Sequence, residues 1–303
     1  MLTAEVERYI VLRQRLGFHL RNEAGNLRAY AQFATARGDD HVRTATAIEW
    51  AGTAPSPHSR HIRLRNVTKL AHFLHAEDGV HEVPPLTIFR DPWVRPLPYI
   101  YTPKEVACIV AAAGRLRATY PMRRPGYATL LGLIASTGLR VSEALDLRFD
   151  DVLPNGVLHI RRTKFGKSRL VPLHPTTNEA LYRYLVIRQA IAAPDTHLFL
   201  SAANNQIPFR TVHSTFRRIL KLAHVAPNRV RTPRIHDMRH TFATRALERC
   251  LAERRAVSRH FVALSTYLGH VDIKQTYWYL EATPELMADI AAAAESLAAG
   301  GDR

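Results

Sequence analysis

Apolar side chains in the first third of the chain recur at the spacing expected of helices. Within residues 3–37, Val6 and Ile10 begin a repeat of three to four residues, which Gly17 interrupts. A similar apolar face follows the glycine, and residues 44–50 fit a further short helix. The pattern therefore predicts three helices in succession.

A fourth helix is predicted to begin at Ser56, because serine is a favoured N-cap and Pro57 suits the first helical position. One face of this helix carries a basic row: Arg60, Arg63, Arg65 and Lys69. Considered alone, such a row is more often ordinary solvated charge than a binding surface. Four helices within residues 1–88 predict a small all-α domain.

Prolines crowd the segment that follows this helical domain. Six of them lie between residues 84 and 103, and they forbid a continuous helix there. We therefore place an extended linker at residues 89–101 and a second domain at residues 102–283. Thr102, a proline after it and Glu105 together predict a capped helix start.

The second domain is expected to combine helices with a small β-element. An apolar run over residues 127–136 predicts a helix that ends near Gly138, and residues 140–147 predict another. Residues 157–160 and 170–173 fit two strands joined by a basic hairpin with a glycine at its turn. The expected fold is mainly α, with an α+β second domain that contains a small antiparallel sheet.

Charge narrows the class of partner. The 303 residues carry a formal net charge of +16, and the excess falls within residues 91–283, which hold 29 Lys and Arg against 13 Asp and Glu. A net positive charge of this size favours a polyanionic partner, nucleic acid above all.

The apolar fraction indicates a folded protein, and the few cysteines indicate a reducing compartment. Apolar residues make up 47% of the chain, and the two cysteines, Cys108 and Cys250, form no CxxC pair. Charges stand where a signal peptide would be apolar, and no apolar run reaches the roughly 18 residues of a membrane span. We expect a cytoplasmic protein without a membrane partner.

Four local groups could carry chemistry, and each is weak alone. The first places Arg140 after a glycine turn and three residues before Glu143, and the second puts Lys164 at the hairpin tip. The third brings His236, Arg239 and His240 onto one helical face, and the fourth leads from a Gly-His turn to an aromatic cluster. Their ordinary alternatives are a surface ion pair, a solvated loop and core packing.

Zinc is the rival chemistry for the third group, because His236 and His240 have the spacing of two metal ligands. A zinc hydrolase needs Glu directly after the first histidine, and Asp237 stands there instead. No third ligand is evident by spacing. We therefore expect no metal at this position.

Taken in order, an Arg, a Lys, a His-x-x-Arg, a Gly-His and a Tyr nine residues later resemble the tyrosine recombinase (phage integrase) family. The resemblance covers residues 102–283 by motif and extends more loosely to residues 1–90, which look like the family's core-binding domain. Met238 stands where the family often has Leu. The pair before Tyr279, Tyr277-Trp278, is bulkier than usual and leaves Tyr277 as a competing nucleophile.

The resemblance assigns roles to residues of this chain. It implies Tyr279 as the nucleophile and Glu143 and His240 as supporting residues. The other implied catalytic residues are Arg140, Lys164, His236, Arg239 and His270. In this setting we expect basic side chains of the helical domain and the hairpin to contact DNA: Arg60, Arg63, Arg65, Lys69, Arg161, Arg162, Lys167 and Arg169.

The implied reaction is breakage and rejoining of DNA. Arg140 and Arg239 would stabilise the charge on the phosphate oxygens, and His236 would accept the proton of Tyr279. The product would be a 3′-phosphotyrosyl enzyme, with Lys164 protonating the 5′-oxygen. Because the ester keeps the bond energy and the cations take a metal's place, neither ATP nor metal is expected.

The resemblance also implies partners. We expect the two domains to form a C-shaped clamp on a double-stranded DNA site, and four copies to assemble on two sites, with accessory or sister recombinases possible. The tail, residues 284–303, would dock on a neighbouring copy or pack on its own domain. A mobile genetic element and a nucleoid-associated location fit this interpretation. A type IB topoisomerase and an inactive DNA-binding regulator are the alternatives.

Overall fold

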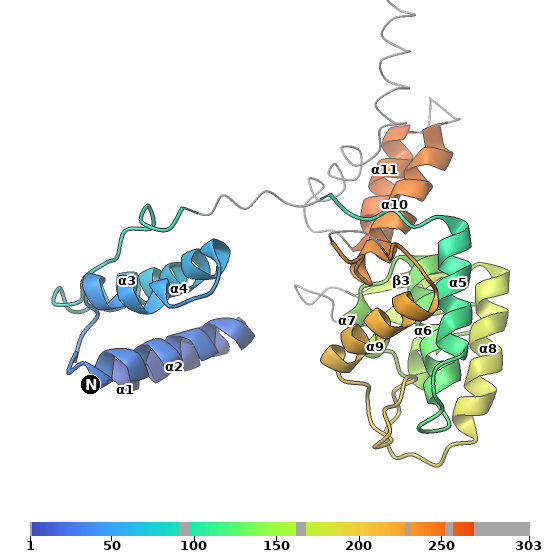
Figure 1. Ribbon diagram of the computed structural model, residues 1–303, viewed down its shortest axis with the longest axis horizontal. Coiled ribbons are helices and arrows are strands. Elements are labelled where there is room, and N and C mark those ends of the chain that lie inside the picture. Colours follow the sequence, from blue (N-terminus) through green and yellow to red (C-terminus); the bar gives the residue numbers. More distant parts are fainter. Residues whose placement is uncertain (1, 91–96, 162–167, 228–230, 252–256, 270–303) are drawn as a thin grey trace, which may run out of the picture. The chain divides into compact units, whose positions relative to one another are not determined.

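The computed structural model describes residues 2–90, 97–161, 168–227, 231–251 and 257–269. The chain divides into two compact units, Met1–Pro96 and Leu97–Arg303 (Figure 1). The division falls inside the predicted linker, residues 89–101. Among the described helices, none has the length and apolar character that crossing a membrane requires.

The first unit is a four-helix domain made of α1 (Leu2–Arg15), α2 (Arg21–Ala36), α3 (Thr44–Gly52) and α4 (Pro57–His75). Its core buries the apolar faces that the sequence pattern predicts, including Ile10, Leu27 and Tyr30. The predicted cap of α4 is confirmed, because Ser56 Oγ accepts a hydrogen bond from the Ser59 amide at 3.2 Å.

The second unit holds the remaining elements. They are α5 (Pro103–Gly114), α6 (Arg123–Thr137), α7 (Val141–Leu145), η1 (Phe149–Asp151), β1 (Val152–Leu153), β2 (Val157–Ile160), β3 (Arg169–Pro172), α8 (Pro175–Gln189), α9 (Phe209–Leu222), α10 (His236–Leu251) and α11 (Val257–Leu268). The capping box at the start of α5 is confirmed: Thr102 Oγ1 accepts from the Glu105 amide, and Glu105 accepts from the Thr102 amide.

A three-stranded antiparallel sheet lies in the order β1-β2-β3. The two strands of the predicted hairpin are present, with β3 beginning one residue earlier than expected, and Ile160 pairs with Arg169 next to the connecting loop. The two-residue strand β1 was not predicted, because so short a segment has no readable alternation.

Helix α6 is central to this unit. It packs against α5, α7, α8 and α10, and it buries Leu130, Leu131 and Ile134 in the main core (Figure 1). Its end therefore fixes where the next segment begins.

The joint between α6 and α7 is a glycine turn. Gly138 caps α6 in the left-handed conformation, with φ of 64°. Arg140 follows with extended backbone, so α7 covers only Val141–Leu145 and the predicted helix over 140–147 is too long. The extended conformation lets Arg140 serve as the N-cap of α7.

Replacing Gly138 by alanine should destabilise the second unit by about 2 kcal/mol, because a left-handed conformation costs a residue with a Cβ about 1–2 kcal/mol. The added Cβ would also lie 2.6 Å from Phe242 Cδ1. Denaturant unfolding measures the loss. The control is Gly132→Ala inside α6, where nothing lies within 4 Å, and it should raise stability by roughly 0.5–1 kcal/mol. Equal effects of the two changes would contradict the prediction.

Candidate active site

Glu143 holds Arg140 in place at the start of α7. The Arg140 amide donates to Glu143 Oε2 at 3.0 Å, and its Nη1 donates to Oε1 at 2.6 Å. The Arg140 side chain is 23% exposed, whereas that of Glu143 is buried. The predicted orientation of the guanidinium by Glu143 is therefore confirmed, and one side of Arg140 remains open to solvent.

Arg169 holds Glu143 from the other side. Its Nη1 and Nη2 donate to the two carboxylate oxygens at 3.1 and 2.8 Å. The Arg169 side chain is 10% exposed and pairs with Glu143 inside the unit, and DNA contact by Arg169 stays a prediction. Burial raises the pKa of Glu143, but the contacts with Arg169 and Arg140 outweigh burial and hold it at about 2.

Helix α10 brings His236, Arg239 and His240 together in its first turns, as the spacing predicts. The two imidazole rings meet edge to face, with centroids 4.7 Å apart. Arg239 is fully buried and donates to Gly138 O and Leu268 O, both at 2.7 Å. Asp237 turns away to accept from the amide and guanidinium of Arg234. The position after His236 is thus used to fix the helix start and does not serve as a general base.

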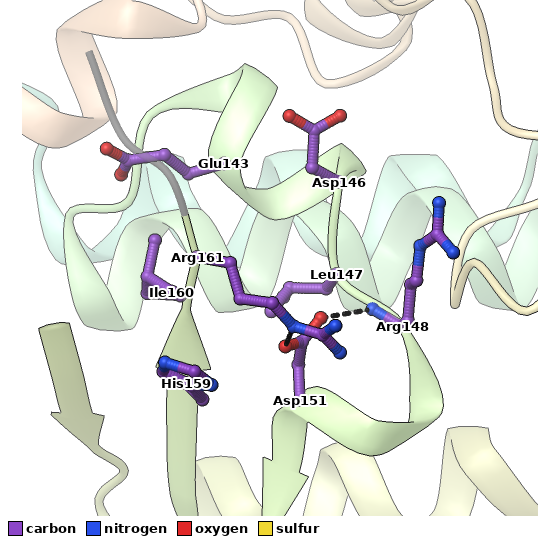
Figure 2. A pocket seen from close by; sticks show the side chains of 8 residues that line it. All are labelled: Glu143, Asp146, Leu147, Arg148, Asp151, His159, Ile160 and Arg161. Atoms are coloured by element: carbon purple, nitrogen blue, oxygen red, sulfur yellow. Dashed lines mark hydrogen bonds and ion pairs between the residues drawn. The ribbon is translucent and has the colours of Figure 1, made fainter. Parts of the chain in front are cut away.

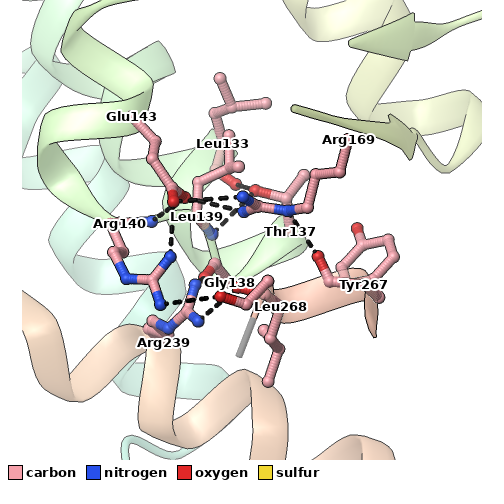
Figure 3. A network of polar contacts seen from close by, with 11 residues as sticks. Leu133, Thr137, Gly138, Leu139, Arg140, Glu143, Arg169, Arg239, Tyr267 and Leu268 are labelled. Carbon is pink, nitrogen blue, oxygen red and sulfur yellow. Dashed lines mark hydrogen bonds and ion pairs between the residues drawn. The ribbon is translucent and has the colours of Figure 1, made fainter. Parts of the chain in front are cut away.

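Three arginines converge on the last turn of α11 (Figure 3). Arg169 Nε donates to Tyr267 O at 2.7 Å, Arg239 Nη2 to Leu268 O at 2.7 Å, and Arg140 Nη2 to Gly269 O at 3.2 Å. A helix end leaves such carbonyls unpaired and carries partial negative charge, which guanidinium groups satisfy. We call Arg140, Arg169 and Arg239 the arginine cap.

Gly269 completes this junction. Its φ of 66° is left-handed, and a Cβ there would lie 2.9 Å from Arg169 Nη1. Only glycine fits both constraints. The junction fixes the point from which the chain continues toward the predicted catalytic residues. Several predicted residues lie outside the described part of the chain: Arg162, Lys164, Lys167, His270, Tyr277 and Tyr279.

Cations also determine the state of His236. The ring keeps an exposed side, yet the protein packed around it and the guanidinium groups of Arg239, Arg234 and Arg140 lower its pKa to about 4. The imidazole is therefore neutral near pH 7 and able to accept a proton.

Arg161 directly follows Ile160, which pairs with Arg169, and it lines a cavity of about 380 Å³ (Figure 2). It forms an ion pair with the buried Asp151, which also accepts from the Arg148 amide at 2.9 Å. The Arg161 side chain is 45% exposed. DNA contact by Arg161 stays a prediction.

The basic row of α4 is partly engaged within its own unit. Arg60 Nε donates to Ala54 O at 2.9 Å, and Arg63 Nη1 donates to Thr53 Oγ1 at 2.8 Å. Lys69 pairs with Glu23 at 3.0 Å, and Arg65 is half-buried. These contacts brace the helices, and DNA contact by this row stays a prediction.

A basic face of α9 was missed in the sequence. The helix buries Val212, Phe216 and Ile219 in the core. Its opposite face exposes four cations: Arg210, Arg217, Arg218 and Lys221. The helical period of the apolar residues in 209–222 is the signal that would have separated these two faces.

The sequence of this chain is similar to those of known recombinases. Residues 101–285 match the phage integrase family. A putative integrase/recombinase of Sinorhizobium fredii, y4rB, is 36% identical over 292 residues, which are 93% of each chain. The tyrosine recombinase XerD of Brucella abortus is 28% identical and covers 81% of this chain and 78% of its own.

Solved structures agree on the fold. The XerH recombinase bound to palindromic difH DNA superposes with a TM-score of 0.65 at 19% identity, covering 90% of this chain and 79% of that one. The Tn1549 transposon integrase gives 0.65 at 19% identity, covering 92% and 94%. The chain belongs to the phage integrase family. It is a tyrosine recombinase, an enzyme class that breaks and rejoins DNA strands.

In the DNA-free protein, an NMR titration should give His236 a pKa below its ordinary value of 6.5, because neighbouring cations and packed protein oppose its protonation. The folded protein should then lose stability as the pH falls from 6.5 toward 4, since the unfolded chain takes up this proton more readily. Arg234→Ala removes one of the cations and should raise the midpoint. A midpoint at 6.5 in the unchanged protein would contradict this interpretation.

Proposed function

We propose that Tyr279 attacks a DNA phosphodiester held between Arg140 and Arg239, and that the chain recombines specific DNA sites through a 3′-phosphotyrosyl intermediate. The observation that carries this proposal is the convergence of the two guanidinium groups. They come from elements about a hundred residues apart, and they donate to neighbouring carbonyls at the end of α11. Tyr279, the proposed nucleophile, follows Gly269 by ten residues.

The chemistry follows from these groups. Attack by Tyr279 forms an oxygen–phosphorus bond and adds negative charge to the non-bridging oxygens, which fixed guanidinium groups stabilise. The tyrosine proton passes to neutral His236. The bond to the 5′-oxygen breaks, and Lys164 supplies a proton to the leaving hydroxyl. Reversal rejoins the strand without ATP, and the cations replace a metal.

Binding of the phosphate should also make His236 a stronger proton acceptor. In the free protein, cations around His236 hold its pKa at about 4, which makes it a weak proton acceptor. A phosphodiester between Arg140 and Arg239 adds negative charge close to the ring and raises that pKa. DNA binding and proton acceptance are therefore coupled.

The partner that fits the charge is double-stranded DNA. The basic face of α9, together with Arg161, offers phosphate contacts beside the site. The similar XerH and Tn1549 proteins were solved with DNA. We propose a site on a mobile genetic element, four copies on two sites, docking by residues 284–303, and action in the cytoplasm on nucleoid DNA.

The nucleophile is tested with nicked suicide duplexes built from the sequences that flank the gene. The unchanged protein should form a covalent complex in EDTA and without ATP, and Tyr279→Phe should abolish it because the attacking oxygen is gone. Tyr277→Phe is the matched control and should keep the complex. If Tyr277→Phe alone abolishes it, the nucleophile is Tyr277. If the unchanged protein binds these duplexes without forming a complex, it is a DNA-binding regulator.

The role of α9 is tested by Arg217→Ala combined with Arg218→Ala. Loss of two phosphate contacts should weaken DNA binding and make the salt dependence of log K shallower by about 0.9 per contact. Fluorescence anisotropy across salt concentrations measures both. Arg183→Ala is the control, because Arg183 is an exposed arginine of α8 outside this face, with a side chain 71% exposed. An unchanged salt slope in the double variant would exclude α9 from the DNA interface.

A further inference from the structure

Strand β3 turns a charged side chain inward and an apolar one outward. Alternate residues of a strand share a face, so Arg169 lies on the same side as the fully buried Val171. Leu170 between them is 59% exposed. Burying a guanidinium while exposing a leucine is unfavourable unless the guanidinium makes specific bonds.

Arg169 makes those bonds in two directions. The two Nη atoms form a fork on the carboxylate of Glu143, and Nε donates to Tyr267 O. One side chain thus joins β3 to α7 and to the end of α11. Such a forked pair fixes geometry more tightly than a single contact would.

Glu143 depends on this fork. Its carboxylate is buried and accepts from Arg140 at one oxygen through Nη1 and at the other through the Arg140 amide. Without Arg169, a buried carboxylate would be left with half of its cationic partners, a situation that is strongly destabilising. It would then draw the Arg140 guanidinium further toward itself and away from the open side of the site.

Gly269 depends on Arg169 as well. Arg169 Nη1 occupies the space where a Cβ at position 269 would lie. The Gly269 amide donates to Thr266 O at 3.0 Å and closes the last turn of α11. Arg169 therefore packs against the junction from which the chain leaves toward the nucleophile.

We propose that Arg169 is a positioning residue for strand cleavage, acting through Glu143 on Arg140 and through the last turn of α11 on the segment that carries the nucleophile. The inference rests on the proposed function of Arg140 and Tyr279. A basic residue of a hairpin is expected to contact phosphate. Under this proposal Arg169 instead makes contacts inside the protein.

The test compares Arg169→Met with Arg188→Met. Methionine keeps length and removes the charge. Arg188 is a buried arginine of α8, 2% exposed, that donates to His197 O and Asp195 O. Both variants lose a buried guanidinium that binds carbonyls, so both should lose stability, and thermal unfolding fixes a temperature at which both are folded.

Three readouts separate positioning from a general loss of fold. Arg169→Met should slow single-turnover formation of the covalent complex about 100-fold at saturating DNA, the usual scale for misplacing one anion-stabilising donor. Its Kd for DNA should change less than about twofold, since the exposed cations remain. Protonation of Glu143 should impair its cleavage at a higher pH than in the unchanged protein, because Glu143 loses a partner that keeps its pKa low. Arg188→Met should change none of the three.

Hydrogen exchange gives a readout that does not need cleavage. In Arg169→Met without DNA, the amide of Gly269 should exchange faster, because the turn that protects it has lost Arg169. Arg188→Met should leave it unchanged.

The outcomes are distinct. Weaker DNA binding with an unchanged cleavage rate at saturation would make Arg169 a phosphate contact and overturn the proposal, as would unchanged exchange at Gly269. Faster exchange in Arg169→Met, when even the unchanged protein forms no covalent complex, would refute the proposed function and leave the link to α11 standing. Equal cleavage rates in a protein that does form the complex would refute only the role of Arg169.

Discussion

The end of helix α11 is the constraint on which the site depends. Its last carbonyls have no partner within the helix, and the arginine cap supplies one for each of Tyr267, Leu268 and Gly269. The three arginines come from β3, from the start of α7 and from α10. Closing one helix end therefore brings three elements into register. Under the proposed function, two of these side chains, Arg140 and Arg239, would also meet the phosphate.

The charge balance explains why this cluster suits an anion. Two guanidinium groups, those of Arg140 and Arg169, pair with the buried carboxylate of Glu143. Arg239 adds a third cation to the cap, whereas the end of α11 contributes only about half a negative charge. Glu143, with its pKa at about 2, stays ionised at every physiological pH and offsets one cation. Burial lowers the pKa of His236, and repulsion from the neighbouring cations lowers it further. A phosphodiester would relieve that repulsion, so binding of substrate and readiness of the base are linked.

The sequence correctly predicted features that depend on neighbouring residues, such as helix caps and helical faces. Ser56 and Thr102 were predicted as caps from a few neighbouring residues, and both are caps. The first-turn face of α10 followed from helical spacing alone. The helix at 140–147 was predicted too long, because Arg140 is the extended N-cap and Asp146 the C-cap of α7. Membership of the family supplied the order of the catalytic residues, and spacing by itself would have left each of them an ordinary surface or core residue.

Arg169 shows where prediction from sequence stops. Hydrophobicity alone would turn Leu170 inward and Arg169 outward, and the structure has the reverse. A strand's register is set by all its contacts together, and here the deciding partners are Glu143, 26 positions earlier, and Tyr267, 98 positions later. Nothing within the hairpin encodes that choice. Arg161, at the opposite side of the same hairpin, pairs with Asp151 at a cavity rim and stays exposed. The basic motif gives no reason to distinguish Arg161 from Arg169, yet their burial differs. Only Arg161 keeps the solvent exposure that a phosphate contact needs.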